Sequence, residues 1–214
     1  MLEPSAAGLD MVSPERRDAF GRHGTSAVDR CGVWLSSRAI RRWLPRRGGL
    51  HVLDLGCGYH ATLLRALLPR LEHGVGIDLE ISPAVRHTPG LSFLSGRIEE
   101  HLPVLADGRF DVVMLISVLE HLVEPVPVLE HCHRMLRAGG LLMVNVPTWW
   151  GKGLLELSAF RLGASPAEEM DDHKMYYDKR DLWPLLVKAG FRPRGIRLRY
   201  HKLGLNLFAV AART

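Results

Sequence analysis

The sequence has 214 residues, of which 47% are hydrophobic and 24% charged, a composition typical of one globular domain that buries a substantial core. Its three cysteines have no C-x-x-C spacing, which argues against a disulfide framework, and its formal net charge is +5. No apolar run reaches the roughly 18 residues of a membrane-spanning helix and the first residues lack a signal-peptide pattern, so we expect a cytoplasmic protein.

The N-terminal region divides into two parts. Residues 1–25 are rich in Pro, Gly, Ala and charged residues, which predicts a flexible arm ahead of a single domain over 26–214. Residues 28–44 place apolar side chains on one side and arginines on the other, which indicates an amphipathic helix ended by Pro45. Within the segment 26–47, this helix would form a cap that packs on the sheet or covers a ligand site.

The most informative stretch begins at a strand expected over residues 51–55. It continues through the glycines at 56 and 58 into a helix expected over residues 60–68. A glycine-rich turn between a strand and a helix exposes backbone N–H groups at the helix N-terminus and lets a ligand approach the main chain.

Asp54 separates the ligand classes that use such a turn. Gly56, Gly58 and Ala61 match the dinucleotide pattern G-x-G-x-x-G/A, but a carboxylate directly before the glycines repels a pyrophosphate. It favours a ligand that carries an ammonium or sulfonium group and no phosphate. An ordinary turn without a ligand is the remaining interpretation. The Asp-x-Gly-x-Gly pattern after a strand resembles motif I of the class I S-adenosylmethionine-dependent methyltransferases, with His60 in place of the third glycine.

The second expected strand, over residues 74–78, ends in Asp78. This residue lies 20 positions after Gly58, where a carboxylate can accept hydrogen bonds from both ribose hydroxyls of a nucleoside. We expect a helix to begin at Ser82-Pro83 and a third strand over 91–94. The family often has an acid directly after the following glycine to contact adenine; Arg97 stands there, so the contact would come from Glu99 or the Ile98 main chain.

The middle of the chain carries the strongest resemblance. Residues 110–116 form an apolar run typical of a buried parallel strand, and the following Ser-Val-Leu-Glu-His-Leu resembles motif IV of the same family. A helix over 126–137, a Gly139-Gly140 turn and a strand over 141–146 complete a resemblance that covers residues 50–147. The resemblance implies a cofactor-binding set of Asp54, Gly56, Cys57, Gly58, Asp78, Leu79, Ile98, Glu99, Leu115 and Ser117.

The segment 148–177 is expected to form a lid or substrate wall, because adjacent tryptophans and glycines follow the end of a strand. The substrate candidates are Trp149, Trp150 and Tyr176; the alternative is that the tryptophans belong to the core. We then expect a helix over 178–189, capped by Asp178 and interrupted by Pro184. Two strands, over 194–200 and 205–211, follow as a hairpin.

Alternating strands and helices followed by a hairpin predict a doubly wound α/β fold with helices on both faces of the sheet. The resemblance implies a Rossmann-like sheet of seven strands in the order 3-2-1-4-5-7-6, with strand 7 antiparallel. Ligands bind such sheets at the carboxyl ends of the strands, where Asp54, Asp78 and Ser117 should lie together.

The resemblance implies a methyltransferase that uses S-adenosylmethionine and releases S-adenosylhomocysteine. We expect a small-molecule, sugar-linked or lipid-linked acceptor, methylated at oxygen, with His121 and His173 as candidate catalytic bases. Some relatives hold a divalent cation at Glu-x-x-Glu-His; Ser117 replaces the first Glu here, so no metal is expected. A fold-retaining protein without catalytic activity and a nicotinamide oxidoreductase are the alternatives.

Basic residues gather in two stretches. Six arginines and no acid lie between residues 30 and 47, and seven Lys or Arg and no acid lie between residues 182 and 214. Solvated faces explain them most simply, and an anionic acceptor or contact with a membrane surface is the alternative. A nucleic-acid partner is not expected, because no Asn/Asp-Pro-Pro-Tyr/Phe tetrad follows the fourth strand.

Overall fold

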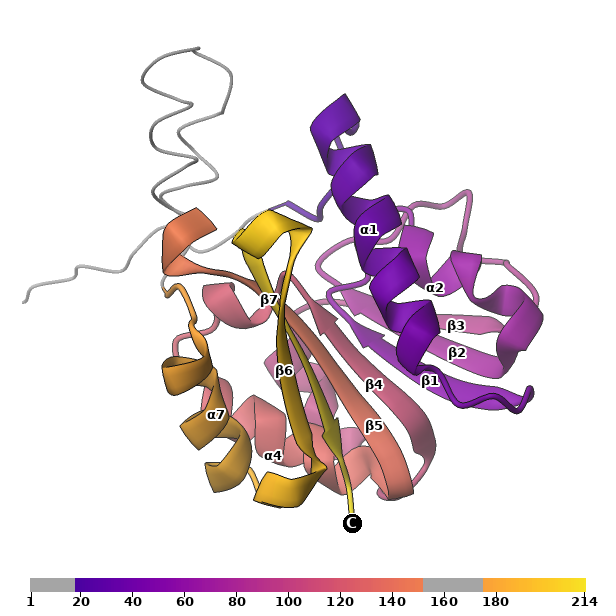
Figure 1. The fold of residues 1–214 in the computed structure, drawn as a ribbon. Coiled ribbons are helices and arrows are strands. Elements are labelled where there is room, and N and C mark those ends of the chain that lie inside the picture. The colour runs from indigo at the N-terminus through magenta and orange to yellow at the C-terminus, as the bar shows by residue number, and fades with distance from the viewer. Residues whose placement is uncertain (1–17, 152–174) are drawn as a thin grey trace, which may run out of the picture.

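A seven-stranded sheet in the order β3-β2-β1-β4-β5-β7-β6 organises the chain in the computed structural model, which describes residues 18–151 and 175–214 (Figure 1). β7 is antiparallel to β5 and β6, and the remaining pairs are parallel. The strands are β1 Leu50–Leu55, β2 Leu71–Asp78, β3 Leu91–Ser95, β4 Phe110–Ile116, β5 Leu136–Pro147, β6 Ile196–His201 and β7 Asn206–Ala212. The strand order and the antiparallel strand 7 are confirmed.

Helices cover both faces of this sheet (Figure 1). The described α-helices are α1 Ala27–Trp43, α2 Thr62–Ala66, α3 Ile98–His101, α4 Pro125–Met135 and α7 Lys179–Lys188. α1 and α2 pack with one side of the strands into one buried cluster, and α4 and α7 pack with the opposite side into another. In the part of the chain that the structure describes, no helix is both long and apolar enough to cross a membrane.

Alternation along the strands decides which side chains face each helical layer, because successive strand residues point to opposite faces. In β1, Leu53 and Leu55 join the cluster with α4 and α7, whereas Val52 joins the cluster with α1 and α2. Asp54 therefore projects toward the α1 and α2 layer. The burial of both faces explains the continuous apolar run over residues 112–116 of β4.

Helix ends follow the capping chemistry of the sequence. Ser26 and Asp29 form a capping box at the start of α1, and Asp178 and Asp181 form another at the start of α7. The helix predicted over 28–44 and the Asp178 cap are confirmed. Pro184 lies inside α7, as the sequence indicated.

Three local predictions were wrong. The helix predicted over 60–68 is only Thr62–Ala66, because Ala61 is left-handed (φ 46°) and a 3₁₀ turn begins at Leu68. Residues 83–87 form a turn instead of a helix, since the Pro89 that follows Thr88 disfavours helical backbone shortly before β3. Gly139-Gly140 does not end a helix but lies inside β5, next to a register shift against β4.

Asp111 ties the amino ends of β1 and β4 together. It is 2% exposed, accepts a hydrogen bond from the His51 N–H at 2.8 Å, and pairs with the guanidinium groups of Arg47 and Arg137. One buried carboxylate thus satisfies a backbone donor and two cations from three separate segments.

Replacing Asp111 by Ala should therefore lower the free energy of unfolding by about 2–4 kcal/mol, because a buried donor and two cations lose their acceptor. Urea denaturation would measure this loss. Arg47→Ala is the control: its side chain is half exposed, so we expect a loss below about 1 kcal/mol. Equal losses in the two variants would contradict this role of Asp111.

Candidate functional site

The candidate site lies at the carboxyl ends of β1 and β2. Asp54 pairs in register with Gly76, so Asp78 lies two residues further along β2 and projects from the same face of the sheet. Both carboxyl groups are buried, with exposed fractions of 1% for Asp54 and 9% for Asp78. The sequence-based prediction that these two acids meet at one edge agrees with this placement.

The loop after β1 is fixed by hydrogen bonds from four consecutive amides. The N–H groups of Gly56 and Cys57 donate to the Ile77 carbonyl, at 2.8 and 3.1 Å. The Gly58 N–H donates to Asp78 Oδ2 at 2.7 Å, and the Tyr59 N–H donates to the Phe20 carbonyl at 2.9 Å. The sequence suggested a cradle of exposed N–H groups at this turn. Instead, these donors bind within the protein and are committed away from any phosphate.

Gly56 is required by both backbone conformation and space. Its φ is 75°, in the left-handed region that side chains disfavour, and a Cβ there would lie 2.3 Å from Val118 Cγ2. Val118 comes from the segment after β4, so the glycine lets two loops of the site pack against each other. Nothing in the sequence signalled this contact.

Asp54 is the most unusual group at the site. Neither of its carboxylate oxygens has a hydrogen-bond partner among the described residues. Burial, and secondly the nearby charge of Asp78, raises its pKa from 3.8 to about 8. A buried acid without partners is costly, so this group is adapted to a ligand that brings a positive charge or hydrogen-bond donors.

Cys57 lies beside the two acids and stays neutral. Burial, followed by the charges of Asp54 and Asp78, raises the pKa of its thiol. A Cβ on Gly76 would lie 2.9 Å from the Cys57 sulfur, so the glycine in β2 makes room for this side chain. The thiol therefore serves as packing at the floor of the site and not as a nucleophile.

Asp78 holds the loop through both of its carboxylate oxygens. Its Oδ1 accepts from the Leu79 N–H at 2.9 Å, and its Oδ2 accepts from Gly58. A carboxylate has about four acceptor positions, so a group of this kind can bind both a loop and hydroxyl donors.

The segment just before α1 also contacts the site. Of the arm predicted over residues 1–25, residues 18–25 are described, and they form a turn against the loop. Arg22 pairs with Glu80 at 2.6 Å, and Phe20 accepts the hydrogen bond from Tyr59. Sequence reasoning missed these contacts, because the composition of this segment indicated only flexibility.

The remaining predicted cofactor residues are less uniform. Ile98 is half-buried against the core and Glu99 is exposed in α3. Leu115 is fully buried on the side of β4 that faces α4 and α7, away from Asp54, so only its main chain is available to a ligand. Ser117 is exposed with φ 60°, and its N–H donates to the Asn145 carbonyl at 2.9 Å.

The opposite wall of the site contains the segments after β4 and β5. Glu120 is buried and His121 is half-buried in the turn Leu119–His121. Trp149 and Trp150 are 46% and 67% exposed, so the interpretation as core residues is wrong. Tyr176 is buried, and its ring lies 5.6 Å from that of Trp149. His173 and most of the predicted lid lie outside the described residues.

Two polar residues near this wall were not predicted. Asn145 is fully buried in β5, and within residues 18–151 and 175–214 its side-chain amide has no hydrogen-bond partner. The sequence feature that could have identified Asn145 is an amide side chain inside an otherwise apolar strand. Lys202 is turned inward so that its Nζ lies 3.5 Å from the position of a Cβ on Gly32. Burial lowers the pKa of Lys202, against the opposing effects of Glu120 and Cys31.

Metal-binding side chains do not gather at this edge. Over the described ranges, no three His, Cys, Asp or Glu side chains lie close enough together to hold a metal ion. The expected absence of a metal stays a prediction.

Comparison with known proteins gives two kinds of similarity. Residues 53–144 match the family described as methyltransferase domain. The chain is 30% identical to a probable S-adenosylmethionine-dependent methyltransferase of Mycobacterium tuberculosis, over 88% of this chain and 65% of that protein. It is 33% identical to a ubiquinone biosynthesis O-methyltransferase of Pseudomonas aeruginosa, over 48% of each chain. The chain thus spans about half to two thirds of the length of these relatives.

Solved structures share the fold at low identity. A chain from the complex of the Haloferax volcanii Trm112 methyltransferase activator with a methyltransferase aligns with a TM-score of 0.66 at 18% identity, covering 86% of this chain and 91% of that one. An S-adenosylmethionine-dependent methyltransferase of Thermotoga maritima aligns with a TM-score of 0.60 at 18% identity, covering 87% and 91%.

The contact between Gly56 and Val118 predicts a measurable coupling. Gly56→Ala should destabilise the protein through both its backbone conformation and the overlap with Val118. When Val118→Ala is added to that variant, it should relieve the overlap but not the unfavourable backbone conformation. The double variant should therefore be more stable than the sum of the single losses predicts, by at least about 1 kcal/mol in urea denaturation. Gly108→Ala is the control, because φ is 59° there and nothing lies within 4 Å. Strictly additive losses would contradict the contact.

Asp54 predicts a specific pH dependence of stability. Because folding raises its pKa from 3.8 to about 8, the native state holds this proton more tightly than the unfolded state. Its contribution is complete below about pH 4 and is lost as the pH rises toward 8, by up to about 1.4 kcal/mol per pH unit. Asp54→Asn should remove this loss, so the variant should gain stability relative to the wild type between pH 5 and 8, as read by thermal unfolding. Parallel pH curves would contradict the assignment.

Proposed function

We propose that this chain, which carries a class I S-adenosylmethionine-dependent methyltransferase domain, transfers a methyl group to the oxygen of a small-molecule, sugar-linked or lipid-linked acceptor. The observation that carries the proposal is Asp54, a buried carboxyl group without hydrogen-bond partners among the described residues, beside Asp78 at the carboxyl edge of the sheet.

The residues present fit the methyl donor. Asp54 would face its amino group, and the Asp78 carboxylate at the end of β2 would accept hydrogen bonds from the ribose hydroxyls. The main chain around Gly56, Leu79 and Ile98 would flank the rest of the methyl donor. Glu99 is exposed, so its side chain could contact the donor only from the solvent side. When bound, the cofactor supplies an activated methyl group on sulfur with a neutral thioether as leaving group.

The loop argues against a dinucleotide. A pyrophosphate needs free N–H donors and no adjacent negative charge. The amides of Gly56, Cys57, Gly58 and Tyr59 are instead committed to acceptors within the protein, and Asp54 lies two residues before the first of them. A nicotinamide oxidoreductase is therefore the weaker alternative.

The two departures from the family pattern lie away from the floor of the site. His60 is exposed, and the centre of its ring lies 4.9 Å from that of Tyr59 in an edge-on arrangement. The His60 ring therefore does not occupy the inside of the glycine loop. Arg97 is exposed at the end of β3. Because both side chains are exposed to solvent, neither replacement is packed into the buried floor of the site, which favours a cofactor-binding protein over a relative that has lost the site.

On the acceptor side, proximity and exclusion of water are the main requirements for displacement at a methyl group. His121 is our candidate for a base that removes the proton of an acceptor hydroxyl, with His173 as the second candidate. The exposed rings of Trp149 and Trp150 would form an apolar wall, continued by Tyr176. The name of the Pseudomonas aeruginosa relative supports oxygen as the acceptor atom.

Calorimetric titration with S-adenosylmethionine and S-adenosylhomocysteine tests the proposal. We expect saturable one-to-one binding by the wild type and a loss of about tenfold to a hundredfold in affinity for Asp78→Ala, which removes charge-assisted hydrogen bonds. The control is Glu72→Gln, an exposed acid at the other end of the same strand, which should bind as the wild type does.

The melting temperature of each variant separates lost binding from lost folding. Absence of binding by a folded wild-type protein would refute the cofactor assignment and favour a non-catalytic binding protein. Unchanged affinity in Asp78→Ala would refute the ribose assignment alone.

A further inference from the structure

The link between β6 and β7 presents a leucine to solvent. Lys202, Leu203 and Gly204 are all left-handed, with φ of 50°, 58° and 91°, and Leu203 is 99% exposed. Consecutive non-glycine residues in this conformation are strained, and such strain persists only where the surroundings hold it. Here Thr148 Oγ1 donates to the Gly204 carbonyl at 2.7 Å, and the Thr148 N–H donates to the Leu205 carbonyl at 3.0 Å. With Lys202 turned inward, Leu203 is held outward.

Aromatic side chains continue from this leucine along the same side of the molecule. Trp150 lies against Gly204, Tyr200 is 53% exposed on β6, and Trp183 is 37% exposed on α7. Lys179 places its ammonium 4.8 Å from the centre of the Tyr200 ring. We call these residues, with Leu203 and Arg180, the α7–β6 face.

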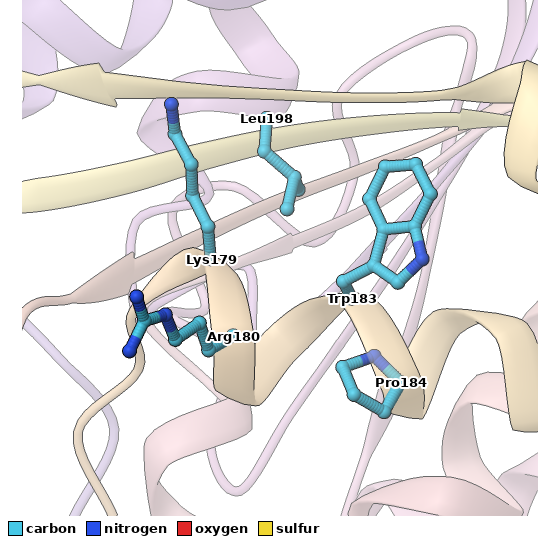
Figure 2. A pocket seen from close by; sticks show the side chains of 5 residues that line it. All are labelled: Lys179, Arg180, Trp183, Pro184 and Leu198. Atoms are coloured by element: carbon cyan, nitrogen blue, oxygen red, sulfur yellow. The ribbon is translucent and has the colours of Figure 1, made fainter.

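A groove of about 500 Å³ runs along this face between α7 and β6. Figure 2 shows Lys179 and Arg180 at one end of the groove, with Trp183 and Pro184 further along the same helix and Leu198 contributed by β6. The floor is apolar and two cations stand at one end, which is the arrangement that suits an acidic head group attached to an apolar chain.

The charged side chains that line the groove are the cations of Lys179 and Arg180. Residues 182–214 contain seven Lys or Arg and no acid, although Arg197 and Arg199 project from the side of β6 opposite to Leu198. The nearby acids are committed elsewhere: Asp181 Oδ2 accepts from the Asp178 N–H at 2.7 Å and from Trp149 Nε1 at 3.3 Å, and Asp178 caps α7. A partner for this face should therefore be anionic.

We propose that the α7–β6 face docks on the surface of an anionic lipid bilayer, with Leu203 and Trp183 entering the interfacial layer and Lys179 and Arg180 contacting phosphate head groups. Tryptophan, tyrosine and the long basic side chains are the residues that favour this layer. A lone leucine on a protruding link suits a soft interface better than a shaped protein groove. The proposal goes beyond methyl transfer and does not depend on it.

The position of the face gives docking a consequence. The β6–β7 link lies at the same edge of the sheet as the ends of β1 and β5, because Thr148 directly follows β5 and bonds to it. Docking would therefore hold the candidate acceptor wall near the bilayer, where a lipid-borne acceptor would be concentrated.

Vesicle co-sedimentation of the full chain tests the proposal. Phosphatidylcholine vesicles are compared with vesicles of equimolar phosphatidylcholine and phosphatidylglycerol, at low and high salt. We expect binding to the anionic vesicles only, weakened by salt. Lys179→Ala with Arg180→Ala, and separately Leu203→Ser with Trp183→Ser, should each lower the bound fraction at least about fivefold.

Two control pairs keep the test specific. Arg42→Ala with Arg65→Ala removes exposed cations on α1 and α2, and Val104→Ser with Val123→Ser removes side chains that are 80% and 75% exposed elsewhere. Both controls should bind as the wild type does, and thermal unfolding should show that every variant is folded at the temperature of the assay. No vesicle binding, equal binding to neutral vesicles, or an equal loss in the controls would overturn the proposal. Concentration-dependent self-association without vesicle binding would assign the face to a protein partner instead.

Discussion

The candidate site depends on one constraint, the burial of the Asp54 carboxyl group without a hydrogen-bond partner in the described part of the chain. The acid lies on the floor of the site next to Asp78, and burial raises its pKa to about 8. A buried carboxyl group without partners opposes folding when it is ionised, so Asp54 lowers the stability of the protein. We attribute the presence of this residue to recognition of a ligand. A ligand that supplies a cation would relieve this cost, and the methyl donor that we propose for this site carries one.

The surrounding loop is built to hold that acid in place. Gly56 turns the chain where a side chain would overlap Val118, and the amides that follow it donate to Ile77, Asp78 and Phe20. Backbone donors that would bind phosphate in a dinucleotide site are thereby used for internal order. The chemistry that this loop offers to a ligand is consequently set by carboxylates and not by N–H groups.

The same edge of the sheet connects the candidate site to the surface. Thr148 links the end of β5 to the β6–β7 turn, which turns the half-buried Lys202 toward α1 while it exposes Leu203. In the order of the sequence, the tryptophans after β5 follow the acids of the site and precede this turn. The proposed cofactor site, acceptor wall and docking face would therefore share one structural edge, and a change in the turn would affect all three.

The sequence by itself determined the strands, the sheet order through the family motifs, and the two acids at the ends of β1 and β2. Apolar periodicity and glycine spacing are local patterns, so they can be recognised in the sequence without the tertiary structure. Only the tertiary structure decided that Val118 fills the space above Gly56, that Asn145 is buried, that Lys202 points inward and that residues 83–87 form a turn. The paired residues are far apart in the chain, and which side chains meet is settled by packing, which no local pattern encodes.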